Sequence, residues 1–156
     1  MYKMVLRMIE EEIQALLRVR NLRIIRDLQW WGVGLVLESP GRASLRIFVD
    51  YRDEHVDVSF MSPVHLDETR TFVEWPYCED PFHRFALWQV LRAKGMPNKM
   101  MTARVDIRDL TSLRNYIKSA IELVRHECLE ILDGDLSISS KIVVNRLPSP
   151  WDSDGE

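Results

Sequence analysis

The 156-residue sequence is poor in cysteine and glycine, has no excess of positive charge and contains no long apolar segment. Its two cysteines, Cys78 and Cys128, are far apart in the chain, and without an export signal we expect both to be reduced and buried. The first residues, MYKMVLRMIEEEIQALL, carry charges every few positions, which excludes the apolar core of a signal peptide or membrane anchor. The sequence therefore predicts a cytoplasmic protein whose fold needs no disulfide.

The charge balance excludes a general attraction to polyanions. The chain has 21 Lys and Arg against 24 Asp and Glu, which gives a net charge of -3. The densest basic segment places arginines at 18, 20, 23 and 26, but such side chains usually cover a core edge or pair with acids. No recognition motif accompanies them, so we expect neither nucleic acid nor a membrane as the partner.

A hydrophobic content of 46% and a charged content of 29% are typical of a globular protein. A chain of this length is most simply one domain with its own core. We predict a single domain over residues 1–147, followed by a flexible acidic tail over residues 148–156.

Apolar residues at helical spacing predict three helices. The first covers residues 3–20, with its stripe at Leu6, Ile9, Ile13, Leu16 and Leu17. The second lies within residues 79–95, where Asp80 caps it, Pro81 takes its first position and Gly95 ends it. The third and longest begins near Asp109 or Thr111 and ends at Gly134. The segment after Asn21 has an ambiguous period and receives no assignment.

Three alternating runs, Gln29–Glu38, Ala43–Tyr51 and His55–Met61, predict strands. The connections SPGR and RDE are too short for a parallel crossover, so the strands form an antiparallel meander. Further candidates are an edge strand at Thr71–Trp75, a strand at Thr102–Ile107 and extended chain in DLSISSKIVVNRL. The predicted fold is α+β, an antiparallel three- to five-stranded meander sheet packed by an N-terminal, a middle and a long C-terminal helix.

The first run has an unusual second face. One face carries Trp31, Val33, Leu35 and Leu37, which suit a core. The opposite face is not polar, and its glycines would permit close approach by another group. The predicted partner-binding residues are Trp30, Gly32, Gly34, Phe48 and Met61, with Arg46 and Asp57 selecting the partner. The alternative interpretation, of equal weight, is a second core layer covered by one of the chain's own helices.

Catalytic and metal sites receive little support from the sequence. Cys78 lies just before a predicted helix that carries His83, but the adjacent acids Glu79 and Asp80 oppose thiolate formation. The strand face with His55 and Asp57, together with His65, Asp67 and Glu68, contains ligand types but no established metal spacing. A zinc site of Cys78, His83, His126 and Cys128 is disfavoured by the helical positions of the last two. We therefore predict no catalytic residue, cofactor or metal.

The order of helix, three-strand meander, capped helix and long C-terminal helix, with the ending LRNYIKSAIELVRHECLEILDGDLS, resembles small bacterial immunity proteins encoded beside toxins. The resemblance covers Trp31–Ser137. The element order is also similar to that of small secretion chaperones, which are α+β dimers that bind an extended partner. Both resemblances imply a protein-binding module that neutralises or escorts a partner by stoichiometric binding. Two alternatives stay open: a small enzyme that uses Cys78 and His83 or a metal-dependent His/Asp site, and a structural subunit that self-associates.

Overall fold

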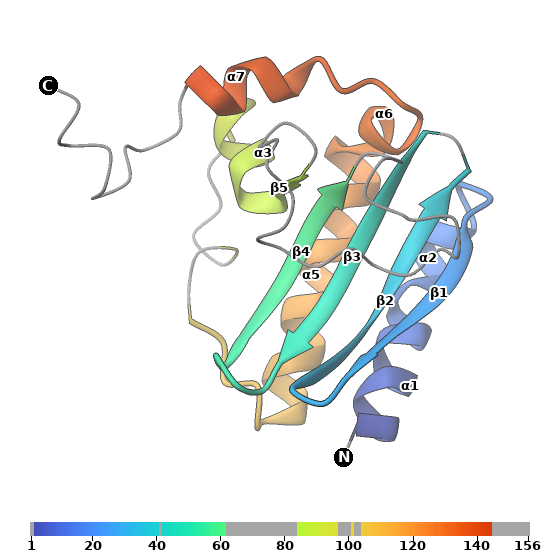
Figure 1. Ribbon diagram of the computed structural model, residues 1–156, viewed down its shortest axis with the longest axis vertical. Helices are drawn as coiled ribbons and strands as arrows, with labels where there is room; N and C mark the ends of the chain where they lie inside the picture. Colours follow the sequence, from blue (N-terminus) through green and yellow to red (C-terminus); the bar gives the residue numbers. More distant parts are fainter. Residues whose placement is uncertain (1, 41, 62–83, 97–100, 102–103, 145–156) are drawn as a thin grey trace, which may run out of the picture.

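The structure, a computed structural model, describes residues 2–40, 42–61, 84–96, 101 and 104–144 (Figure 1). Its elements, in chain order, are α1 Tyr2–Glu12, α2 Gln14–Leu17, β1 Arg23–Gln29, β2 Gly32–Ser39, β3 Ala43–Asp50, β4 His55–Met61, β5 Arg84–Ala86, α3 Leu87–Ala93, α5 Leu110–Glu127, α6 Leu129–Leu132 and α7 Ile138–Val144. Within these residues the five strands form one antiparallel sheet in the order β1-β2-β3-β4-β5. The predicted α+β meander is confirmed.

The pairing of the central strands follows the apolar alternation. Leu35 pairs with Ile47, and Ile47 pairs in turn with Val58, so these side chains share one face of the sheet. The predicted core residues of this face are buried: Val33, Leu35, Leu37, Leu45, Ile47, Val49, Val56, Val58 and Phe60. Tyr51 is partly buried against the same core. The predicted alternation is therefore correct within β2, β3 and β4, whereas Trp31, predicted on the core face, lies in the turn before β2.

The main helices cover this apolar face. Figure 1 shows α1, α2 and α5 together on one side of the sheet, with α1 against β2 and α5 beside α1. Buried side chains on α1 include Leu6 and Ile9, and those on α5 include Leu113, Ile117 and Ile121. The core of the described chain lies between the sheet and these helices.

The first predicted strand starts in the wrong place. Residues Arg23–Gln29 form β1, Trp30 and Trp31 form a two-residue turn, and β2 begins only at Gly32. The signal for β1 was hidden because it is an edge strand, in which Ile24 and Leu28 stay exposed and Asp27 is buried. An apolar and polar alternation cannot indicate a strand whose exposed positions are apolar and whose buried position is charged.

The C-terminal half also departs from the sequence-based prediction. The long helix begins where the sequence predicts, after the N-cap Asp109, but α5 ends after 18 residues because Cys128 takes a φ of −131°. The next helix, α6, ends at Leu132, and Gly134 follows it with a φ of +102°, a conformation that glycine adopts readily. Residues 138–144, predicted to be extended, form the helix α7.

The middle of the chain contains two further differences. Residues Arg84–Ala86, assigned to the middle helix, instead form the short strand β5 beside β4. Residues 104–106, predicted as part of a strand, have no regular secondary structure, and Ile107 lies in a turn. Gly95 follows α3 with a φ of +73°, so the predicted helix end is confirmed.

Several predictions concern residues outside the described part of the chain. These are the cap at Asp80, the proline at position 81, the edge strand Thr71–Trp75 and the tail 148–156. Among the described helices, none combines the length and apolar character needed to cross a membrane.

Candidate functional site

The seven predicted partner-binding residues do not form one exposed surface. Phe48 and Met61 are each 1% exposed and Arg46 is 7% exposed, whereas Trp30 is 77% exposed. Trp30 lies in the turn after β1, beyond the end of the face that carries the other six residues. Trp30 is therefore accessible to another molecule, whereas the Phe48 ring and the Met61 side chain are buried.

The glycines of β2 admit the neighbouring strand rather than a partner. A Cβ atom on Gly34 would lie 2.1 Å from the Ile47 carbonyl oxygen and 2.6 Å from Phe48 Cα. A Cβ atom on Gly32 would lie 2.5 Å from Cε1 of the Phe48 ring. All three distances are shorter than an ordinary van der Waals contact, so the strand pairing and the Phe48 ring require glycine at both positions.

A charged network crosses this second face of the sheet. Arg46 Nε donates to Asp27 Oδ2 at 2.9 Å, and its Nη1 donates to Asp57 Oδ2 at 2.9 Å. Arg84 Nη2 donates to the same Asp57 oxygen at 2.5 Å, and the Arg46 guanidinium lies 4.1 Å from the centre of the Phe48 ring. Buried charges are tolerated when they are paired in this way. Arg46 and Asp57, predicted to select a partner, therefore join strands β1, β3, β4 and β5 to one another.

A partly exposed aromatic cluster lies where two strand turns meet the start of α1. We call Tyr2, Trp30, Trp31, Tyr51 and Arg52 the hairpin-end cluster. The two tryptophan rings pack edge to face at 5.3 Å, and the two tyrosine rings stack at 5.0 Å. Arg52 lies over both indoles, at 5.9 Å from Trp30 and 5.1 Å from Trp31. Tyr2 Oη also donates a hydrogen bond of 3.1 Å to the Trp30 carbonyl oxygen.

Positively and negatively charged side chains lie beside the hairpin-end cluster. The Arg52 side chain is 52% exposed, with Asp53 at 3.8 Å. Glu54, in the same turn, is paired with Arg104 and Arg108 at 3.1 Å each. Partial burial raises the pKa of the Tyr51 phenol, so this ring carries no charge at neutral pH. The result is an aromatic surface with an arginine on it and ion pairs beside it.

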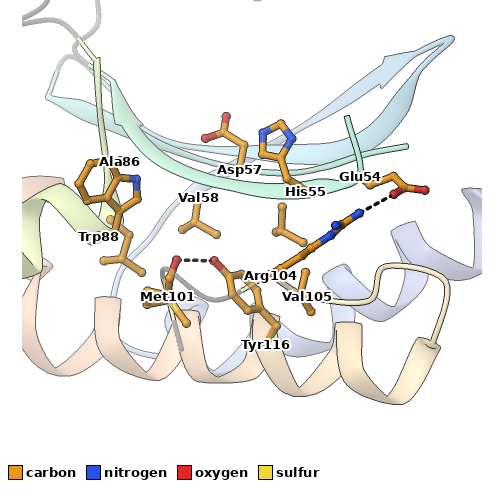
Figure 2. A pocket seen from close by; sticks show the side chains of 12 residues that line it. Glu54, His55, Asp57, Val58, Ala86, Trp88, Met101, Arg104, Val105 and Tyr116 are labelled. Carbon is orange, nitrogen blue, oxygen red and sulfur yellow. Dashed lines mark hydrogen bonds and ion pairs between the residues drawn. The ribbon is translucent and has the colours of Figure 1, made fainter. Parts of the chain in front are cut away.

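A pocket of about 560 Å³ lies next to the β3–β4 turn, where Glu54 and His55 contribute to its lining (Figure 2). The described residues that line it come from the β3–β4 turn, β4, β5, α3, α5 and the positions 101, 104 and 105. They are Glu54, His55, Val56, Asp57, Val58, Ala86, Leu87, Trp88, Met101, Arg104, Val105 and Tyr116. Its volume is within the range of roughly 300–1,000 Å³ that small-molecule sites occupy. Size alone therefore permits a ligand.

The polar groups of the pocket do not converge on its interior. Figure 2 shows Val58 directed toward α5, while His55 and Asp57 lie on the opposite side of β4. Asp57 is held by two arginines on that side. Burial, and next the charge of Asp57, raise the pKa of the Tyr116 phenol, which donates its proton to the Met101 carbonyl oxygen at 3.2 Å. Among the lining residues that the structure describes, none couples a nucleophile to a base.

The alternative catalytic and metal sites are placed as follows. Cys78, His83, His65, Asp67 and Glu68 lie outside the described residues. Burial raises the pKa of the Cys128 thiol to about 12, and His126 is exposed beside Glu122 at 3.2 Å. The helix thus separates His126 from Cys128, as the sequence predicts.

His55 approaches Asp50 and Asp53 rather than sharing a ligand group with Asp57. One ligand atom from each of these three residues lies within 4.8 Å of the others. However, Asp50 Oδ1 accepts the backbone N–H groups of Arg52 and Asp53 at 2.9 Å each. These hydrogen bonds shape the β3–β4 turn, and they account for the position of the Asp50 carboxylate without a metal.

Sequence reasoning found Trp30 but missed its neighbours. Tyr2 precedes the helix predicted for residues 3–20, Trp31 and Tyr51 were expected on a core face, and Arg52 was expected in a connection. Two adjacent tryptophans just before a glycine are the signal that was available, because a two-residue turn can expose both rings at one end of a sheet.

No protein-family model, characterised protein or solved structure matches this chain.

Proposed function

We propose that the chain is a non-catalytic protein-binding module that neutralises or escorts a partner protein in the cytoplasm by stoichiometric binding. The observation that supports this proposal is the hairpin-end cluster, in which Trp30 is 77% exposed. Tryptophan, tyrosine and arginine are the residue types that contribute most to protein interfaces. The cluster combines all three, with Trp30 and Arg52 exposed and the two tyrosines partly buried.

The rigidity of the cluster favours binding. Trp30 packs on Trp31, lies beside Arg52 and has its carbonyl oxygen bonded to Tyr2. A side chain that is already held in one position loses little conformational entropy when a partner covers it. Its large apolar area then leaves water on binding, which is the main favourable contribution at the centre of an interface.

The charges around the cluster suit a role in partner selection. Arg52, Asp53 and the Glu54–Arg104 pair present both signs next to the aromatic rings. Complementary charges at the rim of an interface increase association rates and disfavour incorrect partners. An immunity-like protein needs both properties, because it must capture one partner quickly and ignore others.

The test is affinity capture followed by calorimetry. We expect the wild-type chain, immobilised through its C-terminus, to retain one protein from the source organism at a 1:1 ratio. The Trp30→Ala variant should weaken binding of that protein by about tenfold or more, because loss of an interface anchor removes at least ~1.4 kcal/mol. Trp88→Ala is the matched control, since Trp88 is also an exposed tryptophan but lines the pocket instead.

Two results would contradict the proposal. One is a captured protein whose affinity falls with Trp88→Ala and not with Trp30→Ala, which would move the binding site to the pocket. The other is turnover of a small molecule by the purified chain that survives Trp30→Ala, which would favour the enzyme alternative.

A further inference from the structure

The first strand leaves one edge of the sheet open. Within the described residues β1 pairs only with β2, so its outer backbone groups have no strand partner (Figure 1). Its side chains Ile24 and Leu28 are 42% and 61% exposed. An edge that combines free backbone groups with exposed apolar side chains favours pairing with another strand.

The hydrogen bonds of the sheet show which β1 residues point outward. Tyr51 N donates to Trp31 O at 2.8 Å, so the odd-numbered residues of β2 bond to β3 and its even-numbered residues bond to β1. Gln29, Asp27 and Ile25 pair with these even-numbered residues of β2. The N–H and C=O groups of Ile24, Arg26 and Leu28 therefore point away from β2.

The side chains of the same three residues share the helix-covered face. Ile24, Arg26 and Leu28 pair across with Leu37, Leu35 and Val33, all of which belong to the core. Ile24 and Leu28 remain exposed on this face, and Arg26 between them forms an ion pair of 3.0 Å with Glu10 of α1. The exposed apolar strip thus continues the core face to the sheet edge.

We propose that β1 binds β1 of a second copy of this chain in antiparallel orientation, with the two-fold axis at Arg26. In this register Ile24 of each copy lies opposite Leu28 of the other, because the two residues are equally spaced on either side of Arg26. Every outward backbone group from Ile24 to Leu28 then finds a partner, and the two sheets join into one. A two-fold axis at Ile25 or Asp27 would pair fewer of these groups and would place Ile24 or Leu28 opposite Arg26.

The charges at the axis are compatible with this register. Two Arg26 side chains would face each other, which by itself is unfavourable in an antiparallel pair. Each guanidinium already lies 3.0 Å from a Glu10 carboxylate, so the axis carries two positive and two negative charges. The dimer is thus self-complementary in charge as well as in its apolar contacts.

The dimer does not rest on the proposed function. The hairpin-end cluster is held by α1 and the two turns, and Arg52 and Tyr51 are not part of β1. A dimer without an external partner, or an external partner bound to a monomer, would separate the two proposals.

Proline substitution tests the backbone pairing. Arg26→Pro removes an outward N–H group, so we expect a folded monomer whose dimer dissociation constant rises at least about tenfold in sedimentation equilibrium. Arg26→Ala keeps the N–H group and should leave the dimer intact, which separates the backbone from the ion pair. Ile25→Pro removes an N–H group bonded to β2 and should instead lower the melting temperature of the monomer.

Cysteine cross-linking tests the register. In a Cys78→Ser background, Arg26→Cys should oxidise to a disulfide-linked dimer, because residues paired across an antiparallel sheet lie ~5.5 Å apart at Cα. Arg23→Cys is the matched control, since this register puts the two copies of position 23 about 20 Å apart. The native Cys128 is buried and has a raised pKa of about 12, so it should not interfere.

Three results would overturn the proposal. The first is a wild-type chain that sediments as a monomer at every concentration. The second is a dimer that Arg26→Pro leaves unchanged, which would place the interface elsewhere. The third is a dimer in which Arg23→Cys cross-links as readily as Arg26→Cys, which would contradict the register.

Discussion

The two faces of the sheet are both buried, but by different chemistry. On the helix-covered face the strands contribute aliphatic side chains such as Ile47, which is 0% exposed. On the second face the buried residues include Asp27, Glu38, Ser44, Arg46, Asp50 and Ser59. Adjacent residues of β3, Arg46 and Ile47, therefore meet opposite requirements although both are buried.

This difference shows how burial alone misleads a functional interpretation. An apolar face gains free energy from contact with any apolar cover, at roughly 25 cal/mol per Å². A charged face gains only when each charge meets its partner at the right distance, as Arg46 does with Asp27 and Asp57. The second face consequently depends more strongly on the identity of each residue. The effects of two substitutions on this face on the free energy of unfolding should therefore not be additive.

The largest effects should come from removing Arg46 or Ile47. We expect Arg46→Ala to lower the free energy of unfolding by about 3–5 kcal/mol, because it leaves Asp27 buried without its arginine and removes one of the two arginines that hold Asp57. Ile47→Ala should cost about 2–5 kcal/mol through the cavity that it leaves. Urea denaturation measures both.

A double variant of Arg46 and Asp27 tests whether the charged network of the second face acts as a unit. Arg46→Ala with Asp27→Ala should be less destabilising than the sum of the single variants, with a coupling of about 0.5–3 kcal/mol. Additive effects for this pair would show that the charged network does not stabilise the second face as a unit.

A glycine substitution in β2 should have the next largest effect. Gly34→Ala places a methyl group 2.1 Å from a backbone oxygen of β3, which cannot move without disturbing the sheet. We expect a loss of about 3 kcal/mol, measured by urea denaturation. Gly95→Ala is the control, because a Cβ atom there meets open space and the cost, about 1 kcal/mol, arises only from the φ of +73°. Equal losses at the two positions would contradict the close-approach explanation.

An exposed ion pair gives a smaller effect that depends on pH. Arg20 donates two hydrogen bonds of 2.7 Å to Asp133, and they lower the pKa of this carboxyl group. A lowered pKa in the folded state stabilises the fold above the unfolded-state pKa of about 3.9, and this contribution is lost as pH falls through the folded-state pKa. Arg20→Gln should therefore destabilise the fold at neutral pH and lose that effect at strongly acidic pH.

Thermal unfolding as a function of pH measures this difference. Because both side chains are more than a third exposed, solvent and salt screen the pair, and added salt should reduce the difference at neutral pH. If the difference in melting temperature between the wild type and Arg20→Gln grew as the pH fell, the stabilising role of the Arg20–Asp133 pair would be contradicted.

The smallest effect on stability should come from Trp30→Ala. Since Trp30 is 77% exposed, its removal should change the free energy of unfolding by no more than about 0.5 kcal/mol. Phe48→Ala is the contrasting aromatic substitution on the second face, where Phe48 is 1% exposed and the expected loss is about 3–5 kcal/mol. Chemical denaturation of both variants would test the comparison, and a large loss from Trp30→Ala would assign this residue to the core.

Local patterns predicted the parts of the fold that depend on one face of one element. The buried positions Leu6, Ile9, Ile13 and Leu16, the alternation in β2, β3 and β4, the start of the long helix and the helix end at Gly95 are correct. Each of them follows from a period or a single residue's backbone preference. The predicted helix over residues 3–20 is, however, divided into α1 and α2 and ends at Leu17.

Features that depend on neighbours in space were not predicted. Strand β1 was missed because its pairing buries Asp27 and exposes Leu28, and β5 was missed because three residues carry no period. The break in the long helix at Cys128 leaves its apolar stripe unchanged, so the stripe could not indicate it. The hairpin-end cluster joins residue 2 to residues 30 and 51, and only the folded chain brings them together.

The sequence by itself determined the class of this protein, an antiparallel meander with helices on its apolar face, because alternation and helical spacing are local properties of the chain. Only the tertiary structure decided which of the candidate residues are exposed and which are buried. It turned Trp30 outward in a tight turn and enclosed Phe48, and it placed Arg46 between two carboxylates. These outcomes depend on strand register and on contacts between distant residues, which no local pattern of the sequence specifies.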